Sequence, residues 1–160
     1  REYYMKSFKK FNRLSRELDF FFSDFATNIL EKKYKNTYII FAGGDDLFLV
    51  GDYEEVVAFA KELREEFFRF SLQKATLSMG LVMFKHSTPI NYISTLADDA
   101  ESRAKAVLKD GVDRDGIDIF GISMKFDQFL EIEKSFQTVV GFLENNNVDT
   151  TTFYYRLIEF

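Results

Sequence analysis

The chain has 160 residues, of which 46% are hydrophobic and 29% are charged, and this balance is typical of a folded globular domain. Its formal charge of −5 argues against a free-standing DNA- or RNA-binding domain, which needs a basic face. The absence of cysteine excludes disulfides and thiolate metal sites and fits the reducing cytoplasm. No apolar run approaches the roughly 20 residues of a membrane span, so no membrane partner is expected.

In chain order, the first predicted element is one long amphipathic helix over about residues 4–33. Its apolar residues recur every three or four positions. A β-hairpin follows, because β-rich runs at residues 37–42 and 47–50 flank a very short turn. Asp52 and Glu55 then form an Asp-x-x-Glu start signal for a second helix, a variant of the capping box. The apolar stripe of the first helix consists of Met5, Phe8, Phe11, Leu14, Leu18, Phe21, Phe22, Phe25, Ile29 and Leu30.

The second half of the chain predicts further alternation of strand and helix. Residues 75–84 are apolar on both faces and predict a buried central strand. Thr88 and Pro89 start a helix, with proline at its first position. A short strand at 117–120, a helix at about 127–144 and a new helix from about residue 153 complete the pattern. The core face of the helix after Pro89 is predicted to be Ile90, Ile93, Leu96, Ala97, Ala100, Ala104 and Val107.

This order predicts an α+β fold of the ferredoxin-like palm type that lacks its first strand, with C-terminal helices. We expect residues 1–122 to form the palm domain and residues 123–160 a helical extension. In such a sheet the first strand lies between the runs 47–50 and 76–83. We therefore expect another polypeptide segment in that position, which would add a carboxylate near Asp45.

The hairpin turn carries the clearest chemical signal. Gly43 and Gly44 are followed directly by Asp45 and Asp46. Carboxylate oxygens suit Mg²⁺, and glycine lets the backbone approach a phosphate closely. A surface turn is the alternative reading, because Gly and Asp are ordinary turn residues. The pattern predicts a metal–triphosphate site at the hairpin tip.

The segment Tyr38-Ile-Ile-Phe-Ala-Gly-Gly-Asp-Asp-Leu-Phe-Leu-Val-Gly51 resembles the second palm domain of the large subunit of type III CRISPR effector complexes. Leu14-Ser-Arg-Glu-Leu-Asp-Phe-Phe-Phe22 is similar to that family's first palm helix, and Thr76-Leu-Ser-Met-Gly80 to its central strand. Leu96-Ala-Asp-Asp-Ala-Glu-Ser-Arg-Ala-Lys105 is similar to its next helix, a pattern shared with bacterial diguanylate cyclases. Phe153-Tyr-Tyr-Arg-Leu157 is similar to the start of its helical C-terminal domain.

The resemblance implies a nucleotidyltransferase that polymerises ATP through 3′–5′ links into cyclic oligoadenylates when target RNA is bound. The implied partners are the other subunits of the effector complex and, indirectly, guide RNA and target RNA. Two divalent ions, Mg²⁺ or Mn²⁺, would assist the transfer. Asp45 and Asp46 are the expected metal ligands and catalytic residues, with Gly43 and Gly44 against the phosphates.

Three further residues are weaker candidates. Lys105 is a triphosphate contact by analogy with the cyclases, and a solvated lysine is the alternative. Ser15 and Ser78 are candidates for ribose or base contacts, and a structural role is the alternative for each. His86 is the only histidine, so we expect no His-Asp nuclease site in this sequence.

Two other functions stay open. The palm could be a catalytically silent scaffold in a CRISPR ribonucleoprotein. A diguanylate cyclase-like enzyme is the other alternative, although those enzymes carry Gly-Gly-Asp/Glu-Glu-Phe where this chain has Leu47 after Asp46.

Overall fold

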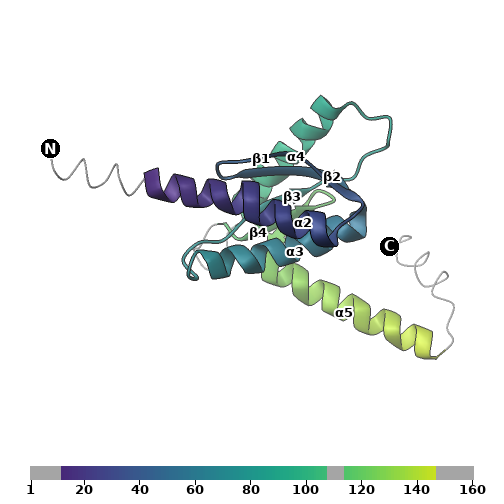
Figure 1. Cartoon of the computed structure of the whole chain (residues 1–160). Coiled ribbons are helices and arrows are strands. Elements are labelled where there is room, and N and C mark those ends of the chain that lie inside the picture. Colours follow the sequence, from purple (N-terminus) through teal and green to yellow (C-terminus); the bar gives the residue numbers. More distant parts are fainter. Residues whose placement is uncertain (1–11, 108–113, 147–160) are drawn as a thin grey trace. The chain divides into compact units, whose positions relative to one another are not determined.

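The computed structural model describes residues 12–107 and 114–146 (Figure 1). The chain divides into two compact units, Arg1–Leu77 and Ser78–Phe160. Helices and strands alternate in both units, which confirms the predicted α+β class. The start of the first predicted helix and the helix predicted from residue 153 lie outside the described residues. No helix in the described part of the chain is both long and apolar enough to cross a bilayer.

The first unit opens with a helix that contains a wider turn. Residues 12–20 are α-helical, η1 (Phe21–Ala26) is a π-helix, and α2 (Thr27–Lys33) is α-helical again. Phe21 and Ala26 are both fully buried, whereas residues five apart point about 140° away from each other on a regular α-helix. The π turn, with its i→i+5 hydrogen bonding, brings such residues toward one side. The sequence predicted one regular helix, and the structure instead interrupts it with a π turn.

Aromatic rings join η1 to α3 (Tyr53–Phe70). The ring centroid of Phe21 lies 5.1 Å from that of Phe67 and 4.9 Å from that of Phe70. Leu14 and Phe25 were predicted in the core and are exposed. The described core begins only at Phe21, and the π turn changes the phase of the helix at Phe25. The other apolar side chains buried in this unit are Phe22, Leu30, Val57, Phe59, Ala60 and Leu63.

The predicted hairpin is confirmed. Strands β1 (Thr37–Gly43) and β2 (Asp46–Gly51) pair antiparallel and form a two-stranded sheet. β1 packs on η1 and α2, and β2 packs on α3. The pairing register shifts between Ile39 and Phe41, which places a β-bulge at Ile40.

The start signal of α3 is confirmed in part. Asp52 is the N-cap and accepts hydrogen bonds from the amides of Glu54 and Glu55. The carboxylate of Glu55 does not reach back to Asp52 as a capping box requires. It accepts instead from the amide and side chain of Asn36, at 2.8 and 2.9 Å, and from Thr37 Oγ1 at 3.1 Å. The start of β1 is thereby tied to the first turn of α3.

The second unit holds a three-stranded sheet in the order β3-β4-β5. β3 (Met79–Leu81) pairs parallel with β4 (Gly116–Ile119), and β4 pairs antiparallel with β5 (Ile122–Lys125). α4 (Ile90–Lys105) crosses between the parallel strands, and α5 (Phe126–Asn145) follows β5 directly. In the described residues no ladder joins β2 to β3. A further strand between them stays a prediction.

Two expectations for this unit were wrong, and one strand was missed. β3 has three residues instead of the predicted ten, because its pairing partner in the described sheet, β4, is itself only four residues long. β5 was not predicted. Its loop is Phe120 and Gly121, both with positive φ, a type I′ arrangement that only the glycine signals. Ile90 is exposed although it was placed in the core, because it stands at the very start of α4.

Two glycines let α4 lie directly on this sheet. A Cβ at Gly80 would lie 2.3 Å from the amide nitrogen of Glu101, and one at Gly116 would lie 2.1 Å from the carbonyl oxygen of Ala104. Ala100 and Ala104 are fully buried at this contact. Glycine on the strands and alanine on the helix therefore set the distance between the two layers.

Candidate functional site at the hairpin tip

The tip of the β1–β2 hairpin has the geometry that its sequence predicts. Gly43 pairs with Asp46 as the last rung of the ladder, so the loop consists of Gly44 and Asp45 alone. Gly44 has a φ of +63°, which a residue with a Cβ adopts only with strain. Both aspartates are exposed. The hairpin therefore presents two adjacent carboxylates at its tip, and their placement is confirmed.

The two glycines of the tip differ in what the fold demands of them. Gly44 is required by its positive φ. Gly43 is not, because a Cβ there would meet Phe41 Cζ at 3.6 Å and Asp19 Oδ1 at 3.8 Å, both ordinary van der Waals distances. Neither backbone conformation nor packing in the described chain explains a glycine at this position. The predicted approach of a phosphate to the backbone at Gly43 is compatible with this and stays a prediction.

Sequence reasoning missed a third carboxylate at the tip. Asp19 lies on the helix that precedes η1, and its Oδ1 accepts a hydrogen bond from the amide of Gly44 at 2.9 Å. The residues are 25 apart in sequence, so no local pattern could have paired them. The only available signal was a carboxylate placed between Leu18 and three consecutive phenylalanines.

The other predicted site residues have different surroundings. Ser15 is exposed and four residues before Asp19 on the α-helical segment 12–20, so both lie on the same helix face. Ser78 and Lys105 belong to the second unit. The Ser78 hydroxyl accepts from the amide of Gly116 at 3.4 Å, and Lys105 Nζ pairs with Glu101 at 2.6 Å. Ser15 thus lies one helical turn before Asp19, the residue that contacts the hairpin tip. Ser78 and Lys105 have partners within the second unit.

The donor set of the tip fits a divalent ion incompletely. Asp45 and Asp46 offer hard carboxylate oxygens, which Mg²⁺ and Mn²⁺ prefer. In the part of the chain that the structure describes, no three Asp, Glu or His side chains are grouped closely enough to hold a metal ion. A metal site at Asp45 and Asp46 therefore stays a prediction, and it would need further ligands from a nucleotide, from water or from another segment.

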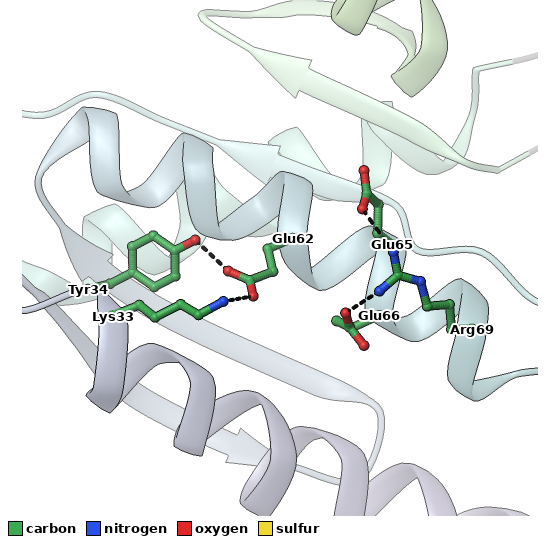
Figure 2. A network of polar contacts seen from close by, with 6 residues as sticks. All are labelled: Lys33, Tyr34, Glu62, Glu65, Glu66 and Arg69. Atoms are coloured by element: carbon green, nitrogen blue, oxygen red, sulfur yellow. Dashed lines mark hydrogen bonds and ion pairs between the residues drawn. The ribbon is translucent and has the colours of Figure 1, made fainter.

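A polar network next to the hairpin ties α2 to α3 (Figure 2). Glu62 on α3 accepts a hydrogen bond from Tyr34 Oη at 2.7 Å and pairs with Lys33. Burial raises the pKa of Tyr34 to about 12, and the hydrogen bond to Glu62 adds to the increase. Burial alone would raise the pKa of Glu62, but its hydrogen bonds from Lys33 and Tyr34 lower it below the usual value. Further along α3, Arg69 pairs with Glu65 and Glu66.

A buried carboxylate connects α4 to the second sheet. Asp118 on β4 is fully buried and receives two hydrogen bonds from Arg103, at 2.8 and 2.9 Å, and one from the Ser123 hydroxyl at 2.5 Å. The hydrogen bonds from Arg103 hold the pKa of Asp118 below its ordinary value against the opposing effect of burial. Every oxygen of this carboxylate is therefore used within the fold, which gives Asp118 a structural role.

Comparison with known proteins assigns the family. Residues 2–117 match the family model of the Cas10/Cmr2 second palm domain. The chain belongs to this family. Cas10/Csm1 of Streptococcus thermophilus, a subtype III-A CRISPR protein described as a single-strand-specific deoxyribonuclease, is 31% identical over 149 residues. Those residues are 91% of this chain and 19% of that protein, so the chain spans about a fifth of the relative's length.

The palm fold is also that of solved structures. A crystal structure of a Csm1–Csm4 cassette in complex with pppApA has a TM-score of 0.66 and is 24% identical, covering 75% of this chain and 20% of that one. The cassette in complex with one ATP has a TM-score of 0.64 at the same identity and coverage. The α+β palm of a Cas10 large subunit is thus the fold of this chain, and the resemblance stated from the hairpin motif is confirmed.

Proposed function

We propose that this chain is the nucleotidyltransferase palm of a type III CRISPR large subunit, which makes cyclic oligoadenylates from ATP when target RNA is bound. The observation that carries the proposal is the exposed Asp45–Asp46 pair beside Gly43, a glycine that the fold itself does not require. The nucleotides bound in the similar Csm1–Csm4 cassettes, ATP and pppApA, are a substrate and a linear product of this kind of reaction. They support an adenine nucleotide as substrate.

In this reaction the 3′-hydroxyl of one nucleotide attacks the α-phosphate of another. A P–O bond forms, the bond to the β-phosphate breaks, and pyrophosphate and the hydroxyl proton leave. The carboxylates of Asp45 and Asp46 would hold Mg²⁺ or Mn²⁺, which activates the attacking oxygen and neutralises charge on the leaving group. Gly43 would let the backbone lie against the phosphates. Ser15, Ser78 and Lys105 are proposed contacts of the ribose, base or triphosphate.

The proposed setting follows the relatives. The similar cassettes contain Csm4 beside Csm1, and we propose that this chain likewise works with other effector subunits, and indirectly with guide RNA and target RNA, in the cytoplasm. Residues 1–122 are proposed as the palm and 123–160 as a helical extension. The deoxyribonuclease activity in the relative's description is not assigned to this chain, in which the only histidine, His86, is exposed.

The test replaces Asp45 and Asp46 together by asparagine in the complete large subunit, assembled with guide RNA. Target RNA and labelled ATP are added, and oligoadenylates are separated and counted. We expect synthesis to fall to background with an unchanged melting temperature, because two exposed ligands are lost and no packing changes. The matched control replaces another adjacent and exposed pair, Asp98 and Asp99 on α4, by asparagine, which removes the same charge. Synthesis by this control should be unchanged.

Three outcomes would contradict the proposal. Undiminished synthesis in the Asp45→Asn, Asp46→Asn variant would end the metal role of the pair. A wild-type complex that binds its RNA and makes no oligoadenylate would favour the silent scaffold. Products from GTP in place of ATP would instead favour the diguanylate cyclase alternative.

A further inference from the structure

The contact between Asp19 and the hairpin joins the two-residue loop at the tip to the helix. Gly44 and Asp45 form the whole loop, and only Gly43 and Asp46 on either side are held by the ladder. Gly44 precedes Asp45 directly, so the plane of its amide influences where the Asp45 backbone points. Since glycine has wide conformational freedom, the orientation of Asp45 depends on what holds the amide of Gly44. In this structure that partner is Asp19 Oδ1 at 2.9 Å.

The helix end that carries Asp19 is itself firmly held. Phe21 and Phe22, just beyond Asp19, are buried with 0% and 3% exposure. The π turn of η1 begins at Phe21, and π turns inside helices often occur at functional sites. β1 packs on η1, and its bulge at Ile40 changes the direction of the strand toward the tip. The core thus holds the helix that carries Asp19 and the strand that leads to Gly44.

The side chain of Asp19 is exposed to solvent, so it does not need this hydrogen bond to satisfy its carboxylate. A solvated carboxylate has water as an equal partner, and the contact adds little to folding. It does fix the loop on one side, at the residue next to the proposed metal ligands. A positioning function therefore explains the contact better than a stabilising one.

We propose that Asp19 is a positioning residue that holds the Gly44 amide and thereby orients Asp45 for nucleotidyl transfer. The proposal rests on the function proposed above. It predicts that the hydrogen-bond acceptor matters more than the charge, because any acceptor at this position can hold the amide. Asn keeps an acceptor oxygen there and Ala removes it.

A competing account has the opposite kinetic signature. The Gly44 amide is also a group that a phosphate oxygen could use, and Asp19 would then occupy the place of the incoming triphosphate. In that account both Asp19→Asn and Asp19→Ala remove a competing anion and lower the KM for ATP. Positioning affects kcat and leaves the KM nearly unchanged.

The experiment measures oligoadenylate synthesis by the complete, RNA-bound large subunit carrying Asp19→Ala or Asp19→Asn. We expect Ala to lower kcat at least about tenfold, because small misplacements of a reacting group cost up to about a hundredfold, while Asn retains most of the rate. Asp24→Ala is the matched control, an exposed aspartate on the same helix, and should leave kcat unchanged. Equal losses with Ala and Asn, a lower KM in both, an unchanged kcat in both, or an equal loss in the control would overturn the proposal.

A second measurement does not depend on activity. Hydrogen exchange of the peptide that contains Gly44 should become faster in Asp19→Ala and remain slow in Asp19→Asn, with no change at α3. Unchanged exchange in the Ala variant would overturn the positioning role even if oligoadenylates are made. Faster exchange in a complex without synthesis would support the contact and count against the proposed function alone.

Discussion

Replacing Gly43 by alanine separates what the fold needs from what the chemistry needs. The added Cβ would meet Phe41 Cζ at 3.6 Å and Asp19 Oδ1 at 3.8 Å, so no atom has to move. Because alanine also restricts the unfolded chain, we expect the free energy of unfolding to stay equal or to rise by up to about 1 kcal/mol. The same methyl group would stand between the backbone and a phosphate, and we expect oligoadenylate synthesis to fall about a hundredfold.

Alanine at two other glycines of the hairpin, Gly44 and Gly51, shows what a glycine required by the fold costs in free energy of unfolding when it is replaced. At Gly44 the φ of +63° makes alanine strained, at a cost of about 1–2 kcal/mol. At Gly51 a Cβ would lie 2.4 Å from Thr37 Oγ1 and 2.6 Å from Thr37 Cα, so overpacking should cost about 1–3 kcal/mol. We therefore expect Gly43→Ala to be the most stable of the three variants and still to lose activity.

Urea denaturation of each variant, followed by circular dichroism, gives the free energies, and labelled-ATP turnover by the complete subunit gives the activity. Full activity of Gly43→Ala would refute the argument that this glycine serves a ligand. A loss of more than about 1 kcal/mol in Gly43→Ala, beyond the range of ordinary surface substitutions, would refute the packing argument.

Two further predictions concern stability. Asp118→Asn should lower the free energy of unfolding by about 1–3 kcal/mol at pH 7, because the buried partners of the carboxylate lose a charged acceptor. Since the folded pKa of Asp118 lies below its ordinary 3.8, the contribution of this carboxylate to stability is complete above about pH 4 and is lost as the pH falls through the folded pKa. The free energy of unfolding should therefore depend less on acid pH in the variant than in the wild type. Parallel pH curves for the two proteins would contradict the role of Arg103. Tyr34→Phe should cost about 1–2 kcal/mol at pH 7 through the lost hydrogen bond to Glu62. Because the folded pKa of Tyr34 is about 12, the wild-type advantage should persist below pH 10 and disappear as the pH rises through 12. In a double-mutant cycle with Glu62→Ala, which removes the acceptor, zero coupling would rule out that hydrogen bond as the source of the advantage.

The sequence alone determined the elements whose causes are local. Two β-rich runs around Gly43-Gly44-Asp45-Asp46 specify a hairpin and its exposed carboxylates, because a two-residue loop requires glycine at a positive φ and leaves its neighbours at the surface. Asp52 specifies the start of α3, because an N-cap needs only amides two and three residues ahead. The amino-acid sequence of the hairpin was also specific enough to indicate the palm family that the comparisons confirm.

Only the tertiary structure decided the contacts between distant segments. The length of β3 depends on how much of β4 lies beside it, and the burial of Phe21 depends on the rings that α3 places against it. Asp19 reaches Gly44 because the core holds helix and hairpin together across 25 residues of sequence. Local propensity cannot predict such a pairing, since the free energy that selects it comes from packing around it rather than from the two residues themselves.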